Sequence, residues 1–198
     1  MFHAIPAQML ERMRFLEQTD VVDRRDGTPK IRRFRQITPD TGRFLALMAA
    51  NAPEGMMVEV GTSAGYSTLW LTLAARARGY PIHTFENDPH KAQLAKETFS
   101  AAGVEQFVEL HVEDARLGLH NIGPIGFCFM DLDKEFYFDC YTLILPRLVQ
   151  GGWLIVDNAT SHKTELAPFL QNALNDPRVD ALIVPIGKGQ LVCRRVLA

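Results

Sequence analysis

The sequence predicts an α/β fold with a mostly parallel sheet of seven strands that ends in an antiparallel hairpin. From residue 56 onwards, short and nearly continuous apolar runs alternate with helical stretches, a pattern typical of parallel strands covered on both faces. The last two runs are separated only by residues 186–189, which suits a hairpin turn. Acidic residues and a glycine directly follow several runs, at the edge where ligands bind in open sheets of this class.

The first 37 residues precede this alternation. Residues 4–18 are predicted to form a helix, because Met9, Met13 and Leu16 recur at helical spacing. Residues 20–35 are polar and are predicted to form a basic loop or arm. Its basic residues are Arg24, Arg25, Lys30, Arg32, Arg33 and Arg35. We therefore divide the chain into an N-terminal helix and basic arm, residues 1–37, and a single domain, residues 38–198.

The domain opens with a helix, for which Thr38 is a suitable N-cap and Pro39 suits the first helical position. The predicted strands cover residues 56–60, 82–86, 107–112, 125–130, 153–156, 179–185 and 190–196. The predicted helices between them cover residues 65–78, 89–102, 135–148 and 162–174. We expect the first five strands to be parallel and the last two to form the hairpin.

Composition excludes several classes of protein. The chain has 198 residues and a net charge of −2, so its bulk charge argues against a strongly basic nucleic-acid binder. Its apolar runs are far shorter than the roughly 18–20 residues of a membrane span, and we expect no membrane association. Cys128, Cys140 and Cys193 lack CxxC spacing, which favours reduced thiols and a cytoplasmic location.

A turn of small residues follows the first run, where residues 58–67 read VEVGTSAGYS. Small residues let a ligand approach the backbone, and the helix that follows offers unpaired N–H groups to a carboxylate or phosphate. The glycines have G-x-x-x-G spacing and not the G-x-G-x-x-G of the dinucleotide fingerprint, which argues against NAD. The alternative is a tight turn that needs glycine only for packing.

Two acidic residues follow the next runs. Glu86 ends the second run, where an acid can accept hydrogen bonds from both ribose hydroxyls. Together with the glycine turn, it indicates an adenosine-containing ligand, although a solvated carboxylate at a strand end is the alternative. Asp114 follows the third run and is expected to contact an adenine or a helix N-terminus, with a simple turn acid as the alternative.

A third group of polar residues ends the fourth and fifth runs. Asp131 follows the fourth, and Asp157 and Asn158 follow the fifth. Adjacent parallel strands bring these three to one edge of the sheet, and their oxygens are ligands suited to Mg²⁺ or another hard divalent ion. The alternative is that each residue caps a neighbouring helix.

These motifs together resemble a known family. VEVGTSAGYS at 58–67, DLDKEFY at 131–137 and the Asp157-Asn158 pair look like the class I S-adenosylmethionine-dependent O-methyltransferases of the caffeoyl-CoA and catechol type, over roughly residues 36–195. The resemblance implies a single-domain, Rossmann-like methyltransferase fold with helices on both faces of the sheet. It also implies S-adenosyl-L-methionine as cofactor and a divalent metal, with Mg²⁺ expected.

The same resemblance assigns roles to residues. It places the following at the cofactor: Ile37, Glu59, Gly61, Thr62, Ser63, Ser67, Glu86, Asp114, Ala115 and Asp131. Asp131, Asp157 and Asn158 match the metal ligands. Lys134 matches the catalytic base, although a helix-start lysine paired with Asp133 or Glu135 is the alternative. His162, close after the metal motif, is either a further ligand or base or a surface residue at a helix start.

We expect methyl transfer to a hydroxyl of a small acceptor, catechol-like or a vicinal diol, by a homodimer. The segment after Asn158 is short, with a helix expected near residue 163, so an open acceptor side is predicted. The basic arm either steers a phosphate-bearing acceptor, such as a CoA ester or the wobble hydroxyuridine of tRNA, or is a solvated arm or dimer contact. A nicotinamide-dependent oxidoreductase and a non-catalytic interaction module are the competing hypotheses.

Overall fold

Seven strands form one sheet in the computed structural model, which describes residues 1–29 and 32–196. Their order is β3-β2-β1-β4-β5-β7-β6. The strands are β1 (Met56–Val60), β2 (Ile82–Phe85), β3 (Val108–His111), β4 (Ile125–Met130), β5 (Leu148–Val156), β6 (Val179–Val184) and β7 (Gln190–Arg195). The first five are parallel, and β7 is antiparallel to both β5 and β6, so the predicted α/β class, strand number and hairpin are confirmed.

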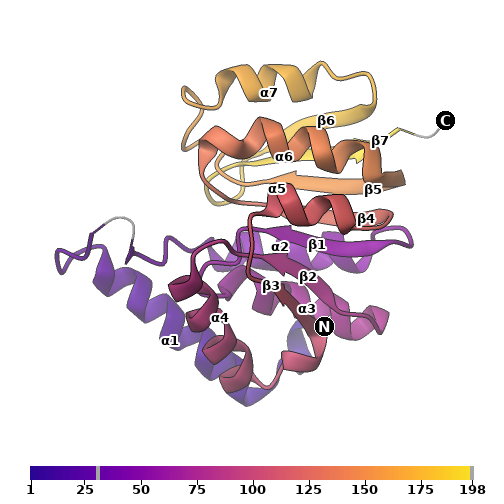
Figure 1. The fold of residues 1–198 in the computed structure, drawn as a ribbon. Coiled ribbons are helices and arrows are strands. Elements are labelled where there is room, and N and C mark those ends of the chain that lie inside the picture. Colours follow the sequence, from indigo (N-terminus) through magenta and orange to yellow (C-terminus); the bar gives the residue numbers. More distant parts are fainter. Residues whose placement is uncertain (30–31, 197–198) are drawn as a thin grey trace.

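Helices connect the strands and cover the sheet (Figure 1). The α-helices are α1 (Ala7–Asp23), α2 (Pro39–Ala50), α3 (Tyr66–Arg78), α4 (Pro89–Ala102), α5 (Ala115–Gly118), α6 (Tyr137–Ile144) and α7 (Ala167–Leu174). Short 3₁₀ helices cover Phe2–Ala4, Glu105–Phe107, Leu119–Asn121, Lys134–Phe136 and Leu145–Arg147.

Two hydrophobic cores lie on opposite faces of the sheet, because side chains alternate along each strand. On one face, Met57 of β1 and Phe127 of β4 pack against apolar residues of α1, α2, α3 and α4. On the other, Val58 and Cys128 pack against α5, α6 and α7. The expected helices on both faces are thus present. On this second face α5 is short, with only four residues.

Local sequence signals explain where several helices begin and end. The Thr38 side chain accepts a hydrogen bond from the Thr41 amide, so Thr38 caps α2 as predicted. Asp88 and Asp114 cap α4 and α5 in the same way. Gly79 ends α3 with φ of +77°, a backbone conformation that favours glycine.

Some predicted bounds are wrong. The N-terminal helix begins at Ala7 and runs to Asp23, so it takes up part of the expected arm. The last helix begins at Ala167 and not near residue 163, because residues 157–166 form consecutive turns. The fifth strand begins five residues earlier than predicted, since its glycine-containing start still pairs with β4. Lys30 of the basic arm lies outside the described residues.

Two further expectations concern the surroundings of the chain. Cys128, Cys140 and Cys193 are free and buried, and burial raises the pKa of each thiol. Within residues 1–29 and 32–196, every helix is too short or too polar to cross a bilayer.

Candidate functional site

A cavity of about 380 Å³ lies at the carboxyl ends of β1, β2 and β4. Most of the residues predicted from the sequence line it: Ile37, Gly61, Thr62, Ser63, Ser67, Glu86, Asp114, Ala115, Asp131, Lys134, Asn158 and His162. Glu59 and Asp157 are buried beneath this lining. The structure therefore brings the predicted residues together from six separate segments of the chain.

The glycine turn between β1 and α3 forms one wall. Gly61 has φ of +100°, and a Cβ atom built on it would lie 2.0 Å from the carbonyl oxygen of Asp131. Only glycine fits this approach of two strand ends. Ser63 also has a positive φ, of 48°, and Gly65 has 85°. The turn leaves the first residues of α3, Tyr66 and Ser67, facing the cavity.

Glu86 fastens this turn from the neighbouring strand. Its Oε2 accepts a hydrogen bond from the Ser63 amide at 2.8 Å, and its Oε1 accepts one from the Asp88 amide at 2.9 Å. Each carboxylate oxygen can accept more than one hydrogen bond, so Glu86 keeps capacity for ligand hydroxyls in the cavity it lines. The Glu86 carboxylate therefore both binds the backbone of the glycine turn and lines the cavity.

Glu59 lies under the turn and is fully buried. Its Oε2 accepts hydrogen bonds from the hydroxyls of Thr68 at 2.5 Å and Thr84 at 2.6 Å. Thr84 also contacts the hydroxyl of Thr62 at 2.6 Å, and Thr62 lines the cavity. Burial raises the pKa of the Glu59 carboxyl to about 7, although neighbouring hydroxyls lower it in part. Hydrogen bonds through Thr84 and Thr62 therefore connect Glu59 to the cavity wall.

Asp114 and Ala115 form the far end of the cavity. The Asp114 carboxylate accepts from the Arg116 amide at 2.9 Å and pairs with the Arg116 guanidinium at 2.6 Å. These hydrogen bonds lower the pKa of Asp114. Of the alternatives weighed for Asp114, the structure shows the helix cap.

Asp131, Asp157 and Asn158 cluster at the opposite end. The Asn158 amide donates from Nδ2 to Asp131 Oδ1 at 2.8 Å and to Asp157 Oδ2 at 3.1 Å. Asn158 has φ of +71°, a conformation that asparagine tolerates better than most residues. The side chain of Gln190 donates to the other oxygen of Asp157. The two carboxylates are therefore held on either side of one amide group.

This donor set fits a hard divalent cation. Burial, and then the charge of Asp131, raise the pKa of Asp157 to about 6, so a cation bound between the two carboxylates would stabilise their ionised forms. Asn158 carries an amide whose oxygen and nitrogen can exchange places, and Ser161 Oγ, 3.3 Å from its oxygen, can accept as well as donate. Turned in this way, the amide would present an oxygen beside two carboxylate oxygens, as Mg²⁺ prefers.

Lys134 lies next to this cluster. Its Nζ donates to Asp131 Oδ1 at 3.1 Å, to the Leu132 carbonyl at 2.9 Å and to the Tyr137 hydroxyl at 2.6 Å. Its acidic partner is thus Asp131, and the side chain is only 14% exposed. Burial raises the pKa of Tyr137 well above its ordinary value, so Tyr137 stays a neutral partner for the amine.

The segment before α2 closes the cavity from the N-terminal side. Lys188, in the turn between β6 and β7, donates to the carbonyls of Arg35 at 3.2 Å and Gln36 at 3.1 Å. The Phe34 amide donates to Asp23 at 2.8 Å, which ties the same segment to α1. Three arginines of the basic arm line the cavity: Arg24, Arg33 and Arg35. The arm is therefore folded onto the site.

Sequence reasoning missed some residues of this site. Tyr137 belongs to the motif DLDKEFY, yet no role was predicted for it. Gln190 and Lys188 come from the C-terminal hairpin and carry no local signal, because only the antiparallel pairing of β7 with β5 places Gln190 beside Asp157.

Comparisons with known proteins agree with this arrangement. A family model described as O-methyltransferase matches residues 22–196. Catechol O-methyltransferase of Niastella koreensis is 34% identical over 135 residues, 66% of this chain and 58% of that protein. Catechol O-methyltransferase of Mycobacterium tuberculosis is 32% identical over 124 residues, 62% of this chain and 56% of that protein. The chain thus spans less than two thirds of both curated relatives.

Solved structures share the fold as well. The crystal structure of cofactor-bound Rv0187 from MTB superposes with a TM-score of 0.78 at 25% identity, covering 93% of this chain and 89% of that one. The family match covers nearly all of the described residues, including every strand and the whole cavity wall after residue 22. The chain belongs to the O-methyltransferase family.

Proposed function

We propose that this protein transfers a methyl group from S-adenosyl-L-methionine to a hydroxyl of a small catechol-like or vicinal-diol acceptor, assisted by Mg²⁺. The observation that carries the proposal is the convergence of Asp131, Asp157, Asn158 and Lys134 at one end of a cavity whose other end carries Glu86. Family membership and similarity to two catechol O-methyltransferases favour methyl transfer over hydride transfer or a non-catalytic role.

The cavity residues divide between the two substrates. Glu86 and the turn at Gly61–Gly65 would hold the ribose and methionine portions of S-adenosyl-L-methionine, with Asp114 and Ala115 beside the adenine. Thr62 connects this region to the buried Glu59 through Thr84. Ile37, buried just before the cap of α2, would pack over the cofactor.

The acceptor end supplies charge and a proton acceptor. Asp131, Asp157 and Asn158 would hold the divalent ion, whose positive charge lowers the pKa of a phenolic hydroxyl from about 10. Lys134 Nζ, which contacts Asp131, the Leu132 carbonyl and Tyr137, would take the hydroxyl proton when neutral. The acceptor oxygen then bonds to the methyl carbon as the carbon–sulfur bond breaks, and sulfur keeps the electron pair.

Methyl-transfer assays test this proposal. With labelled S-adenosyl-L-methionine, a catechol and Mg²⁺, we expect Asp131→Asn, Asp157→Asn and Lys134→Met to lose at least about 100-fold in kcat/KM, since proton transfer alone contributes 10²–10⁴-fold. Asp180→Asn, an exposed acid on β6, serves as the control and should keep full activity. Full activity in excess chelator, or in both aspartate variants, would refute the metal-assisted mechanism.

The arginines on the cavity wall favour one second candidate. Arg24, Arg33 and Arg35 line the cavity and carry charge that suits a phosphate-bearing acceptor, such as the wobble hydroxyuridine of tRNA. If tRNA is the acceptor, its binding should weaken steeply as salt is raised, and Arg33→Gln should reduce that salt dependence. Absence of binding at low salt would exclude this candidate.

We also propose that the protein is a cytoplasmic homodimer. The α1 helix exposes Phe15, Val21 and Val22 to between 49% and 56%, which suits a dimer contact, and the three buried free cysteines suit a reducing compartment. Analytical ultracentrifugation should give twice the chain mass, and Val22→Asp should shift the protein to monomers. An unchanged sedimentation coefficient in Val22→Asp would place the contact elsewhere or exclude it.

A further inference from the structure

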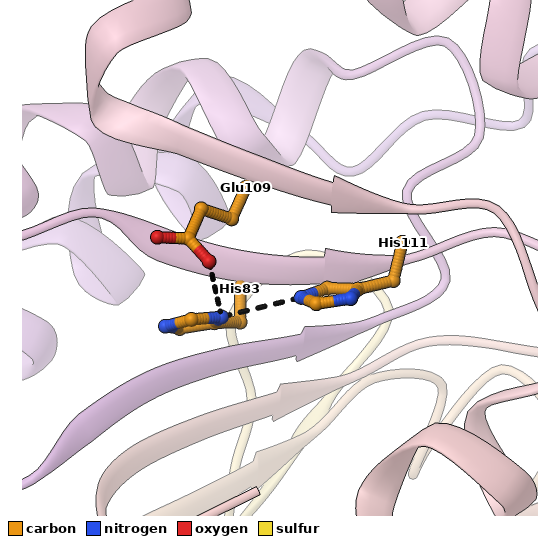
Figure 2. Close-up of side chains that lie close together, drawn as sticks. All are labelled: His83, Glu109 and His111. Carbon is orange, nitrogen blue, oxygen red and sulfur yellow. Dashed lines mark hydrogen bonds and ion pairs between the residues drawn. The ribbon is translucent and has the colours of Figure 1, made fainter. Parts of the chain in front are cut away.

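A second cluster of metal-binding side chains lies outside the cavity, at the edge of the sheet formed by β2 and β3. His83 comes from β2, and Glu109 and His111 come from β3. In the parallel register His83 lies opposite Glu109 and Phe85 lies opposite His111, so alternate residues share one face. Figure 2 shows the three side chains pointing toward one another from the two strands.

The three side chains converge on one point. His83 Nδ1 lies 3.2 Å from Glu109 Oε2 and 3.2 Å from His111 Nε2. One ligand atom from each residue lies within 4.8 Å of the others. Ligands bound at about 2.0–2.1 Å around a tetrahedral ion are separated by roughly 3.3 Å, so the two shorter distances already match such a site.

The cluster is partly exposed to solvent, and aromatic stacking holds its two imidazole rings. The side chains of His83, Glu109 and His111 are 16%, 54% and 31% exposed. The His111 ring stacks on Phe85 with centroids 4.6 Å apart and on His83 at 5.5 Å, which fixes both imidazoles. A carboxylate oxygen of Glu113 lies 3.8 Å from His111 Nδ1.

We propose that His83, Glu109 and His111 bind a first-row divalent ion such as Zn²⁺, with water completing a tetrahedral site. Two imidazole nitrogens and one carboxylate are a known ligand set for zinc, and they suit it better than Mg²⁺. Glu113, with a carboxylate oxygen 3.8 Å from His111 Nδ1, would move closer to become the outer partner, since a ligating histidine almost always gives its second N–H to an oxygen. This site is separate from the Asp131 cluster and does not depend on the proposed methyl transfer.

The competing interpretation is a packed histidine pair with an ion pair to Glu109. In that case one imidazole donates a hydrogen bond to the other between His83 Nδ1 and His111 Nε2, and Glu109 lies beside His83 Nδ1. Both interpretations use the same contacts, so metal uptake distinguishes them.

Cobalt titration provides the test, because tetrahedral Co²⁺ absorbs visible light and replaces zinc. Chelator-treated protein is titrated with CoCl₂ in excess Mg²⁺, and Zn²⁺ is then added as competitor. We expect one equivalent of tetrahedral Co²⁺ that Zn²⁺ displaces, and its loss in the His83→Asn, His111→Asn double variant. His120→Asn, which changes an exposed histidine outside the cluster, and Asp131→Asn should keep the equivalent.

Two further variants distinguish a lost metal site from a misfolded protein. Glu109→Gln changes a side chain that is more than half exposed and should abolish tetrahedral uptake while leaving the circular dichroism spectrum unchanged. Glu113→Gln should keep the site but weaken Zn²⁺ affinity roughly 10–100-fold, the usual effect of losing an outer partner. No tetrahedral band in the wild type, or equal uptake in the double variant, overturns the proposal.

Discussion

The buried Glu59 makes a sharp prediction about pH and stability. It is enclosed by Thr68 and Thr84, and burial raises its pKa to about 7 from 4.5. Glu59→Gln keeps the shape and the hydrogen-bonding capacity of the side chain and removes the ionisable group. The variant therefore isolates what it costs to ionise one carboxyl beneath the glycine turn.

The size of the effect follows from the two pKa values. Below pH 4.5 the carboxyl is protonated in the folded and the unfolded chain, so it does not alter the free energy of unfolding. Between pH 4.5 and about 7 the unfolded chain has lost this proton and the folded chain keeps it, so stability falls as pH rises. At about 1.4 kcal/mol per pH unit, the loss reaches about 3 kcal/mol above pH 7.

Urea denaturation of the wild type and Glu59→Gln at several pH values checks this. We expect the free energy of unfolding of the variant to exceed that of the wild type by up to about 3 kcal/mol more at pH 8 than at pH 4, with most of the change between pH 4.5 and 7. The comparison between the two proteins cancels the other titrating groups. Parallel stability curves for the two proteins would refute the assignment of a buried, protonated carboxyl.

Three other substitutions have equally definite outcomes. Asp176→Asn should lower the free energy of unfolding by about 1–2 kcal/mol at pH 7, because hydrogen bonds from Arg178 and from Tyr141 lower the pKa of Asp176 to about 2. The difference in stability between the wild type and the variant should vanish as pH falls from about 4 to 2, and urea midpoints measured over this range check it. Gly61→Ala should lower the free energy of unfolding by more than the roughly 1–3 kcal/mol of backbone strain, because its Cβ would also meet the Asp131 carbonyl. Gly79→Ala, also at positive φ but with open space around its Cβ, is the control and should lose only that strain. Equal losses of stability in urea would contradict the close approach of Gly61 to Asp131. Lys188→Met should cost about 1–2 kcal/mol and expose the arm to limited proteolysis, and an unchanged digestion pattern would show that these hydrogen bonds do not hold it.

Most of the fold is predictable from the sequence because its strands are buried on both faces. Continuous apolar runs marked β1 and β4 to the residue, and Thr38-Pro39 marked the start of α2. The errors occur where periodicity is weak. The residues after Asn158 have the composition of a helix start, yet their amides donate to carbonyls of the β6–β7 turn, which keeps them in turns.

The candidate site was predictable only where motifs follow strands. Such residues as Gly61, Glu86 and Asp131 share an edge because parallel strands end together, so their proximity follows from topology. Gln190 and Lys188 join the site only because β7 pairs antiparallel with β5, and no local sequence pattern predicts that pairing. Likewise, the proximity of His83 on β2 to His111 on β3 follows only from the register that pairs those strands.

The hairpin that carries Lys188 and Gln190 also sets the order in which the site can form during synthesis. Lys188 bonds to segments about 150 residues earlier in the chain, and Gln190 holds Asp157. A nascent chain that has emerged only as far as α7 has β1 to β5 and the glycine turn, but it lacks the hydrogen bonds from Lys188 to the arm and from Gln190 to Asp157. The end of the cavity beside Asp157 should therefore take its final form only after β7 has left the ribosome.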